Sequence, residues 1–145
     1  MKFSKFFEEN IINEWKDFYI NYQLMKKLLH PIIKDYKERK HKLLFKKEAA
    51  LNEKLLTAEY DINIQESYKD QFLIELEKCE FFYRANLKFY NARLNKIIEQ
   101  LEYVKNNPNF SDQLDKLELA LKELYKEINL MRSYIQINLK AKSKL

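Results

Sequence analysis

Glycine is absent from this 145-residue chain, and proline occurs only twice. Because glycine adopts left-handed backbone conformations at the least cost, its absence disfavours the tight turns of β-hairpins. The single cysteine, Cys79, excludes an intramolecular disulfide, and with only His30 and His41 beside it the chain lacks the ligands of an ordinary zinc site. No apolar run reaches the ~18 residues that a membrane-spanning helix needs. These absences favour an all-α protein without a structural metal.

Two long segments carry apolar residues at intervals of three and four, which is typical of helices with one buried face. The first spans 64–104, and the second follows a turn at 105–110, with Ser111 as its N-cap. Two long helices joined by a short turn run antiparallel. We expect Leu87 and Leu121 to be core residues of this pair. The full apolar seams are Phe72, Leu76, Cys79, Tyr83, Leu87, Tyr90, Leu94, Ile97, Leu101 and Val104, and Leu114, Leu117, Leu121, Leu124, Ile128, Met131, Ile135 and Leu139.

The N-terminal part is predicted to form two shorter helices, at 2–14 and 17–29. The second should end before Pro31, because the residue preceding a proline disfavours the α conformation. Residues 32–60 are rich in lysine, and we expect much of this stretch to be helical.

The resulting prediction is one all-α domain over residues 1–145. Its parts are an N-terminal helical hairpin at 1–30, a basic connector at 31–63 and a long helical hairpin at 64–145. The short hairpin packs on the two long antiparallel helices, in a three-helix-bundle-like arrangement.

Net charge is +5, so the chain favours polyanionic partners. It has no glycine-rich phosphate loop, no nucleophile elbow and no HExxH motif, and we predict that it is not an enzyme. Carboxylates such as Glu75 and Glu77 are expected on a solvated helix face.

One helical face near the N-terminus combines Tyr19, Tyr22 and Lys26, at positions i, i+3 and i+7. A phenol and an ammonium on one rigid face can donate hydrogen bonds to a phosphate. The alternative is that both tyrosines are core aromatics and that Lys26 reaches past them to water. Spacing by itself leaves both interpretations open.

Four segments, in this order, resemble the SPX domain family: Met1-Lys2-Phe3 at the start, residues 14–26 with Tyr22 and Lys26, ELEKCEFFY at 75–83 and LYKEINLMRSYIQIN at 124–138. The resemblance covers most of the chain. It implies a cytosolic helical module that binds inositol polyphosphates and pyrophosphates and reports the cell's phosphate status. The implied ligand is inositol hexakisphosphate or an inositol pyrophosphate, with no other cofactor.

SPX domains pair a tyrosine and a lysine, four residues apart in the second helix, with lysines of the last long helix. The resemblance therefore implies that Tyr22, Lys26 and Lys144 belong to a binding cluster. From the grouping of basic side chains we predict that Lys2 and Lys140 join the same cluster, with Lys140 one helical turn before Lys144. Lys144 matches the first lysine of the family's lysine-rich stretch, whereas Lys142 stands where an aromatic residue is usual. The later lysines of that stretch are absent, so we expect that the chain is truncated at its C-terminus.

The resemblance implies an attached C-terminal effector domain, such as a transporter, a polyphosphate polymerase or a signalling protein, or else a separate partner protein. It implies a cytoplasmic location, which includes the cytosolic face of a membrane protein, and no nucleic acid partner. Two alternatives remain open. One is a helical adapter that binds another protein without a ligand, and the other is binding to an anionic membrane surface through the basic stretch 34–47.

Overall fold

The computed structural model describes residues 2–45, 51–107 and 111–145. Its elements in chain order are α1 (Phe3–Asn10), a short 3-10 helix η1 (Asn13–Phe18), α2 (Tyr22–Phe45), α3 (Leu51–Asn106) and α4 (Ser111–Lys144). Every element in these ranges is helical, so the all-α prediction is confirmed. No residue in the described part has a positive φ, as expected for a chain without glycine.

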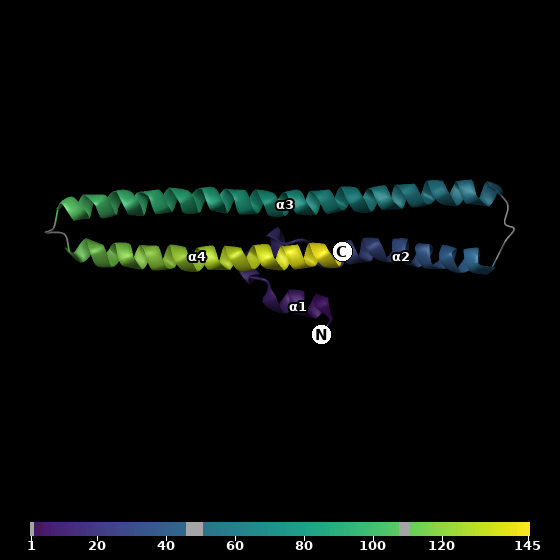
Figure 1. Ribbon diagram of the computed structural model, residues 1–145, viewed down its shortest axis with the longest axis horizontal. Coiled ribbons are helices and arrows are strands. Elements are labelled where there is room, and N and C mark those ends of the chain that lie inside the picture. The colour runs from purple at the N-terminus through teal and green to yellow at the C-terminus, as the bar shows by residue number, and fades with distance from the viewer. Residues whose placement is uncertain (1, 46–50, 108–110) are drawn as a thin grey trace.

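Helix α3 is the axis of the molecule (Figure 1). It has 56 residues, which corresponds to a rod about 84 Å long at 1.5 Å per residue. Helix α4 packs antiparallel along its C-terminal half and α2 along its N-terminal half, so that α2 and α4 lie end to end (Figure 1). Helix α1 contacts α4 near this junction, and η1 contacts α3. The predicted antiparallel pair of long helices is confirmed.

Helix α2 runs through Pro31, so the prediction that a helix ends before this proline is wrong. A proline inside a helix removes the hydrogen bond to the carbonyl four residues earlier, here that of Lys27. Both Lys27 and Pro31 are exposed, and water can therefore hydrate the freed carbonyl. Much of the predicted connector at 31–63 is also helical, because α2 extends to Phe45 and α3 begins at Leu51.

The core lies at the junction, where the N-terminal segment meets the long helices. Tyr134, Ile20, Met25 and Leu124 have less than 2 % of their surface exposed. Other buried members of the same cluster are Phe7, Tyr19, Tyr22, Phe82, Tyr90, Met131, Ile137 and Ala141. The segment before α2 and the first turn of α2 thus supply five of these twelve core residues, and the hairpin supplies the other seven.

The predicted seams divide into a buried row and an open row. On α4, Leu117 and Leu124 are buried, whereas Leu121 is 48 % exposed. On α3, Tyr90 is buried and Leu87 is 41 % exposed. The prediction that Leu87 and Leu121 are core residues is therefore wrong. A pair of helices buries only the side of each seam that faces the partner, and the other side needs a third element.

Candidate functional site

Helix α1 is held against the first turn of α2 by aromatic side chains. The Phe3 ring packs edge-on against Tyr22 with ring centroids 4.9 Å apart, and the Phe7 ring lies 5.7 Å from Tyr22. Tyr22 is buried, so its ring is a core residue. The donation of a hydrogen bond from its hydroxyl to a phosphate stays a prediction.

Two lysines from different helices reach α1. Lys26 of α2 donates a hydrogen bond through Nζ to Ser4 Oγ at 3.3 Å. Lys140 of α4 places its Nζ 5.1 Å from the centroid of the Phe6 ring, within the range of a cation–π contact. Ser4 and Phe6 are two residues apart in α1. The structure therefore brings Lys26 and Lys140 to the same short helix, although they are far apart in sequence.

The remaining predicted lysines lie at helix ends. Lys2 is exposed and occupies the N-cap position of α1, directly before Phe3. Lys144 is exposed in the last turn of α4, one helical turn beyond Lys140 and on the same face. The action of all five predicted side chains on one ligand stays a prediction.

These lysines have no acidic partner among the residues that the structure describes. Other lysines do: Lys5 lies 3.7 Å from Glu9, and Lys122 lies 2.7 Å from Glu118. An exposed ammonium without a carboxylate neighbour keeps its full attraction for an external anion.

The segment that precedes α2 is fixed by side chains of both long helices. The Phe18 carbonyl accepts hydrogen bonds from the Tyr134 hydroxyl at 2.8 Å and from Cys79 Sγ at 3.3 Å. Burial raises the pKa of the Tyr134 hydroxyl and the pKa of the Cys79 thiol. Both groups therefore stay protonated at neutral pH and can serve as donors.

Asn138 of α4 makes the next contact along this segment. Its Oδ1 accepts the backbone N–H of Ile20 at 2.9 Å, and its Nδ2 donates to the Tyr134 carbonyl at 3.0 Å. Only 7 % of Asn138 is exposed. Asn138 was not among the predicted site residues, although it lies seven residues after Met131 and so falls on the buried row of α4.

Glu75 of α3 also fixes the segment that precedes α2. Its Oε2 accepts the backbone N–H of Asn21 at 2.8 Å and lies 2.6 Å from Lys78 Nζ. Glu75 is only 6 % exposed, so the prediction of a solvated carboxylate is wrong. Its burial could have been predicted from its place in the seam, because it lies three residues after Phe72 and four before Cys79, where the spacing predicts an apolar side chain.

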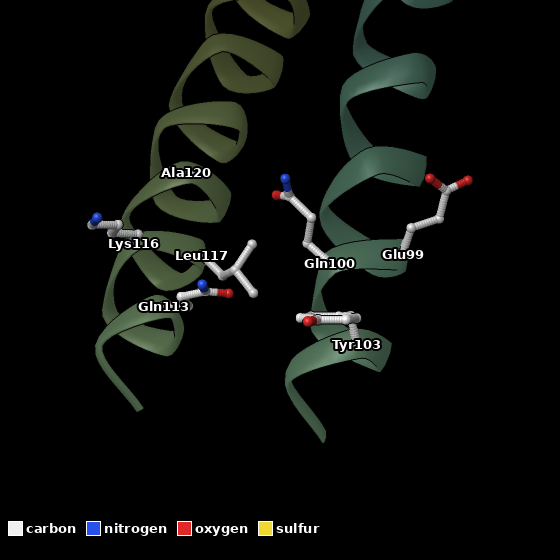
Figure 2. A pocket seen from close by; sticks show the side chains of 7 residues that line it. All are labelled: Glu99, Gln100, Tyr103, Gln113, Lys116, Leu117 and Ala120. Carbon is white, nitrogen blue, oxygen red and sulfur yellow. The ribbon is translucent and has the colours of Figure 1, made fainter. Parts of the chain in front are cut away.

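A cleft of about 490 Å³ lies between the C-terminal part of α3 and the start of α4 (Figure 2). Gln100 and Leu117 point toward one another across it (Figure 2). Its lining residues are Glu99, Gln100, Tyr103, Gln113, Lys116, Leu117 and Ala120. One carboxylate and one ammonium give this cleft no net charge, and none of the predicted lysines lines it. It is therefore a poor site for a polyanion.

A second cleft, of about 430 Å³, lies beside the N-terminus of α2 and includes Tyr22. Lys16 and Lys78 line it together with Glu8 and Asp17, so its charges also balance. Within the described ranges, no group of three or more His, Cys, Asp or Glu side chains is placed to hold a metal ion. None of the helices in those ranges has an apolar stretch suited to crossing a membrane.

Comparisons with known proteins agree with the motifs in the sequence. A family model described as the SPX domain matches residues 1–59. The glycerophosphocholine phosphodiesterase GDE1 of Candida albicans is 28 % identical over 145 residues, which cover 95 % of this chain and 11 % of that protein. The chain thus spans about a tenth of the length of this relative. The match to the SPX domain model fits a regulatory module related to phosphate. The predicted resemblance to the SPX domain family is therefore confirmed, with the family match located in residues 1–59.

Proposed function

We propose that this protein binds a multiply phosphorylated inositol at a surface formed by Lys2, Tyr22, Lys26, Lys140 and Lys144. The observation that carries the proposal is the approach of Lys26 and Lys140 to the same short helix, at Ser4 and Phe6. Ammonium groups that reach one short helix from two other helices repel one another, and a polyanion bound at that helix would offset the repulsion. An inositol polyphosphate is such an anion.

The donors of this surface suit a ligand with several phosphates. Lysine is a flexible point charge, and separate lysines can each approach a different phosphate of one ring. Inorganic phosphate can engage only part of the surface at a time. The ligand should therefore be inositol hexakisphosphate or an inositol pyrophosphate rather than inorganic phosphate.

The proposed role is regulatory. SPX domains are modules that report phosphate status to another part of the same protein or to a partner. The relative GDE1 aligns with this chain over only 11 % of its own length, which fits a module beside other domains. We infer a cytoplasmic module that regulates an attached or partner protein and does not itself catalyse a reaction.

A helical adapter is the second candidate function, and one feature favours it. An apolar groove of about 270 Å³ runs between α3 and α4, with Leu87 and Leu94 on one wall and Ile128 and Ile135 on the other. Leu87 and Ile128 are more than 40 % exposed. Such a groove can accept an apolar helix from another protein.

Calorimetric titration with inositol hexakisphosphate and with inorganic phosphate tests the first proposal. The hexakisphosphate should bind more tightly, and its affinity should fall steeply as salt is added, because exposed charges are screened over about 8–10 Å at physiological ionic strength. Lys26→Ala should weaken binding more than Lys37→Ala. The two lysines are a matched pair, since both are exposed and both lie on α2.

Tyr22→Phe should have a smaller effect than Lys26→Ala. The loss of one hydrogen bond costs about 0.5–1.5 kcal/mol, and up to ~3 kcal/mol if the partner is charged. Equal losses for Lys26→Ala and Lys37→Ala would reduce the site to nonspecific attraction. Absence of any binding would favour the adapter.

A further inference from the structure

The two halves of the proposed binding surface belong to separate helices. Tyr22 and Lys26 lie on α2, whereas Lys140 and Lys144 lie on α4. Helix geometry fixes the spacing within each half, but it says nothing about the distance between the halves. That distance depends on tertiary contacts near the junction of α2 and α4.

The buried side chain of Asn138 links the two halves, through positions just before Tyr22 and just before Lys140. The Oδ1 atom of Asn138, two residues before Lys140, accepts the N–H of Ile20, two residues before Tyr22. The N–O distance is 2.9 Å and the partners are 118 residues apart in the chain. A buried backbone N–H that loses its acceptor carries a substantial free-energy cost, so the bond strongly favours this arrangement.

We propose that Asn138 is a positioning residue, which sets the α2 half of the polyphosphate site against the α4 half. This inference rests on the proposed function. Asn138 does not itself touch the ligand; it acts through Ile20 and the helix that follows.

The amide is the side chain that this position requires. Its Nδ2 donates to the Tyr134 carbonyl, which fixes the rotamer, and its Oδ1 then faces Ile20. Leucine has a similar shape but no acceptor. Aspartate keeps an acceptor for Ile20 but loses the donor and places a buried negative charge near a carbonyl.

The same contact links ligand binding to the junction. If the ligand binds best when both halves are aligned, it stabilises the state in which the bond between Asn138 and Ile20 is formed, and the bond in turn strengthens ligand binding. The effects of Lys26 and Lys140 on ligand affinity should therefore be coupled in the wild-type protein. The coupling should be lost when Asn138 is removed.

The test compares Asn138→Ala with Asn86→Ala. Asn86 is a matched control, because its Nδ2 donates to the Phe82 carbonyl four residues earlier at 2.8 Å, as Asn138 does to Tyr134. Affinity for inositol hexakisphosphate is measured at a temperature where each variant is folded, which separates affinity from stability. We expect Asn138→Ala to weaken binding about tenfold, the change for one well-placed hydrogen bond. Asn86→Ala should leave the affinity within about twofold.

A double-mutant cycle of Lys26→Ala and Lys140→Ala gives the second readout. Non-additive losses in the wild-type background and additive losses in the Asn138→Ala background support the positioning role. Equal affinity of Asn138→Ala and Asn86→Ala overturns it, because a residue needed only for folding would lower stability without changing the affinity of the folded protein.

Hydrogen exchange of the wild-type protein decides the matter even if Asn138→Ala does not fold. Bound hexakisphosphate should slow exchange of the Ile20 amide, and unchanged exchange overturns the proposal. These failures are distinct from failure of the proposed function. A wild-type protein that binds no hexakisphosphate removes the proposed function itself, whereas wild-type binding with normal affinity in Asn138→Ala removes only the role of Asn138.

Discussion

The α3–α4 hairpin carries the same three-and-four spacing at both ends, yet the two ends are buried very differently. Near the junction with α2, Tyr134 is 1 % exposed and lies against Phe82 with ring centroids 5.1 Å apart. Toward the turn that joins α3 to α4, Val104 and Leu117 are buried, but Leu101 and Leu121 are nearly half exposed. An apolar seam thus predicts a helix face that can be buried, and burial itself depends on what packs there.

The third element at the junction is the N-terminal segment. The Trp15 ring of η1 contacts Phe82 at 5.3 Å and Tyr134 at 6.0 Å, and Tyr19 lies 4.6 Å from Tyr134. Together they cover a face of α4 that the partner helix α3 leaves open. Among the described residues, no comparable aromatic cluster covers the other end of the hairpin.

The largest expected effect is a loss of stability on mutation at the buried end of the hairpin. Tyr134→Ala should lower the free energy of unfolding by about 3–5 kcal/mol, the range for removing a large buried aromatic side chain. Tyr125→Ala is the control on the same helix, since Tyr125 is 66 % exposed and should change stability by no more than about 0.5 kcal/mol. Urea unfolding followed by circular dichroism measures both. Similar losses would mean that the junction is not the main core.

The second expected effect is a difference in stability between variants in the buried row and the open row of the α4 seam. Leu124→Ala should cost about 2–5 kcal/mol, because Leu124 is buried, whereas Leu121→Ala should cost about 1 kcal/mol. Urea unfolding followed by circular dichroism measures both losses. A loss at Leu121 as large as that at Leu124 would show that a third element covers the open row in solution.

The smallest expected effect concerns pH. Burial raises the pKa of Tyr134 above its ordinary value of 10.0, so its stabilising contribution is fully present below pH 10.0 and is lost as the pH rises further. Above that pH the unfolded chain releases the Tyr134 proton and the folded chain retains it. The free energy of unfolding should then fall by up to ~1.4 kcal/mol per pH unit for this group.

Tyr134→Phe should make this alkaline loss less steep. It removes only the hydroxyl that donates to Phe18, and the ring can keep its packing. Tyr125→Phe, at an exposed position of the same helix, is the matched control. Unfolding followed between pH 9 and 11 provides the measurement, and identical slopes for the two variants would contradict the burial of the Tyr134 hydroxyl.

Much of the fold followed from local patterns. The absence of glycine and the two apolar seams predicted an all-α chain with an antiparallel pair of long helices, and both features are present. The end of α2 did not follow from such a pattern. A proline disfavours a helix locally, but the cost at Pro31 is small enough for contacts between α2 and α3 to outweigh it.

The residues of the candidate site also divide into those predicted from the sequence and those found only in the structure. Lys26 was predicted from its helical spacing and the family resemblance, and Lys140 from its place one turn before Lys144; the structure places both against α1. Asn138 was not predicted as a site residue and Glu75 was wrongly placed on a solvated face, because a polar residue in a helix is ordinarily solvated. Their partners are backbone N–H groups of Ile20 and Asn21, which no pattern within α3 or α4 reveals.

The sequence by itself determined that the chain is all-α and contains an antiparallel pair of long helices, because helix propensity and apolar spacing act over one or two turns. It also determined the chemistry available at the proposed site, which would consist of lysines and a tyrosine. Only the tertiary structure decided which seam residues are buried and which lysines reach α1. Those outcomes depend on contacts between η1, α1 and the long helices, between residues as far apart as Ile20 and Asn138. A buried hydrogen bond across such a distance forms only after the helices have packed, and so the spacing of residues along one helix cannot encode it.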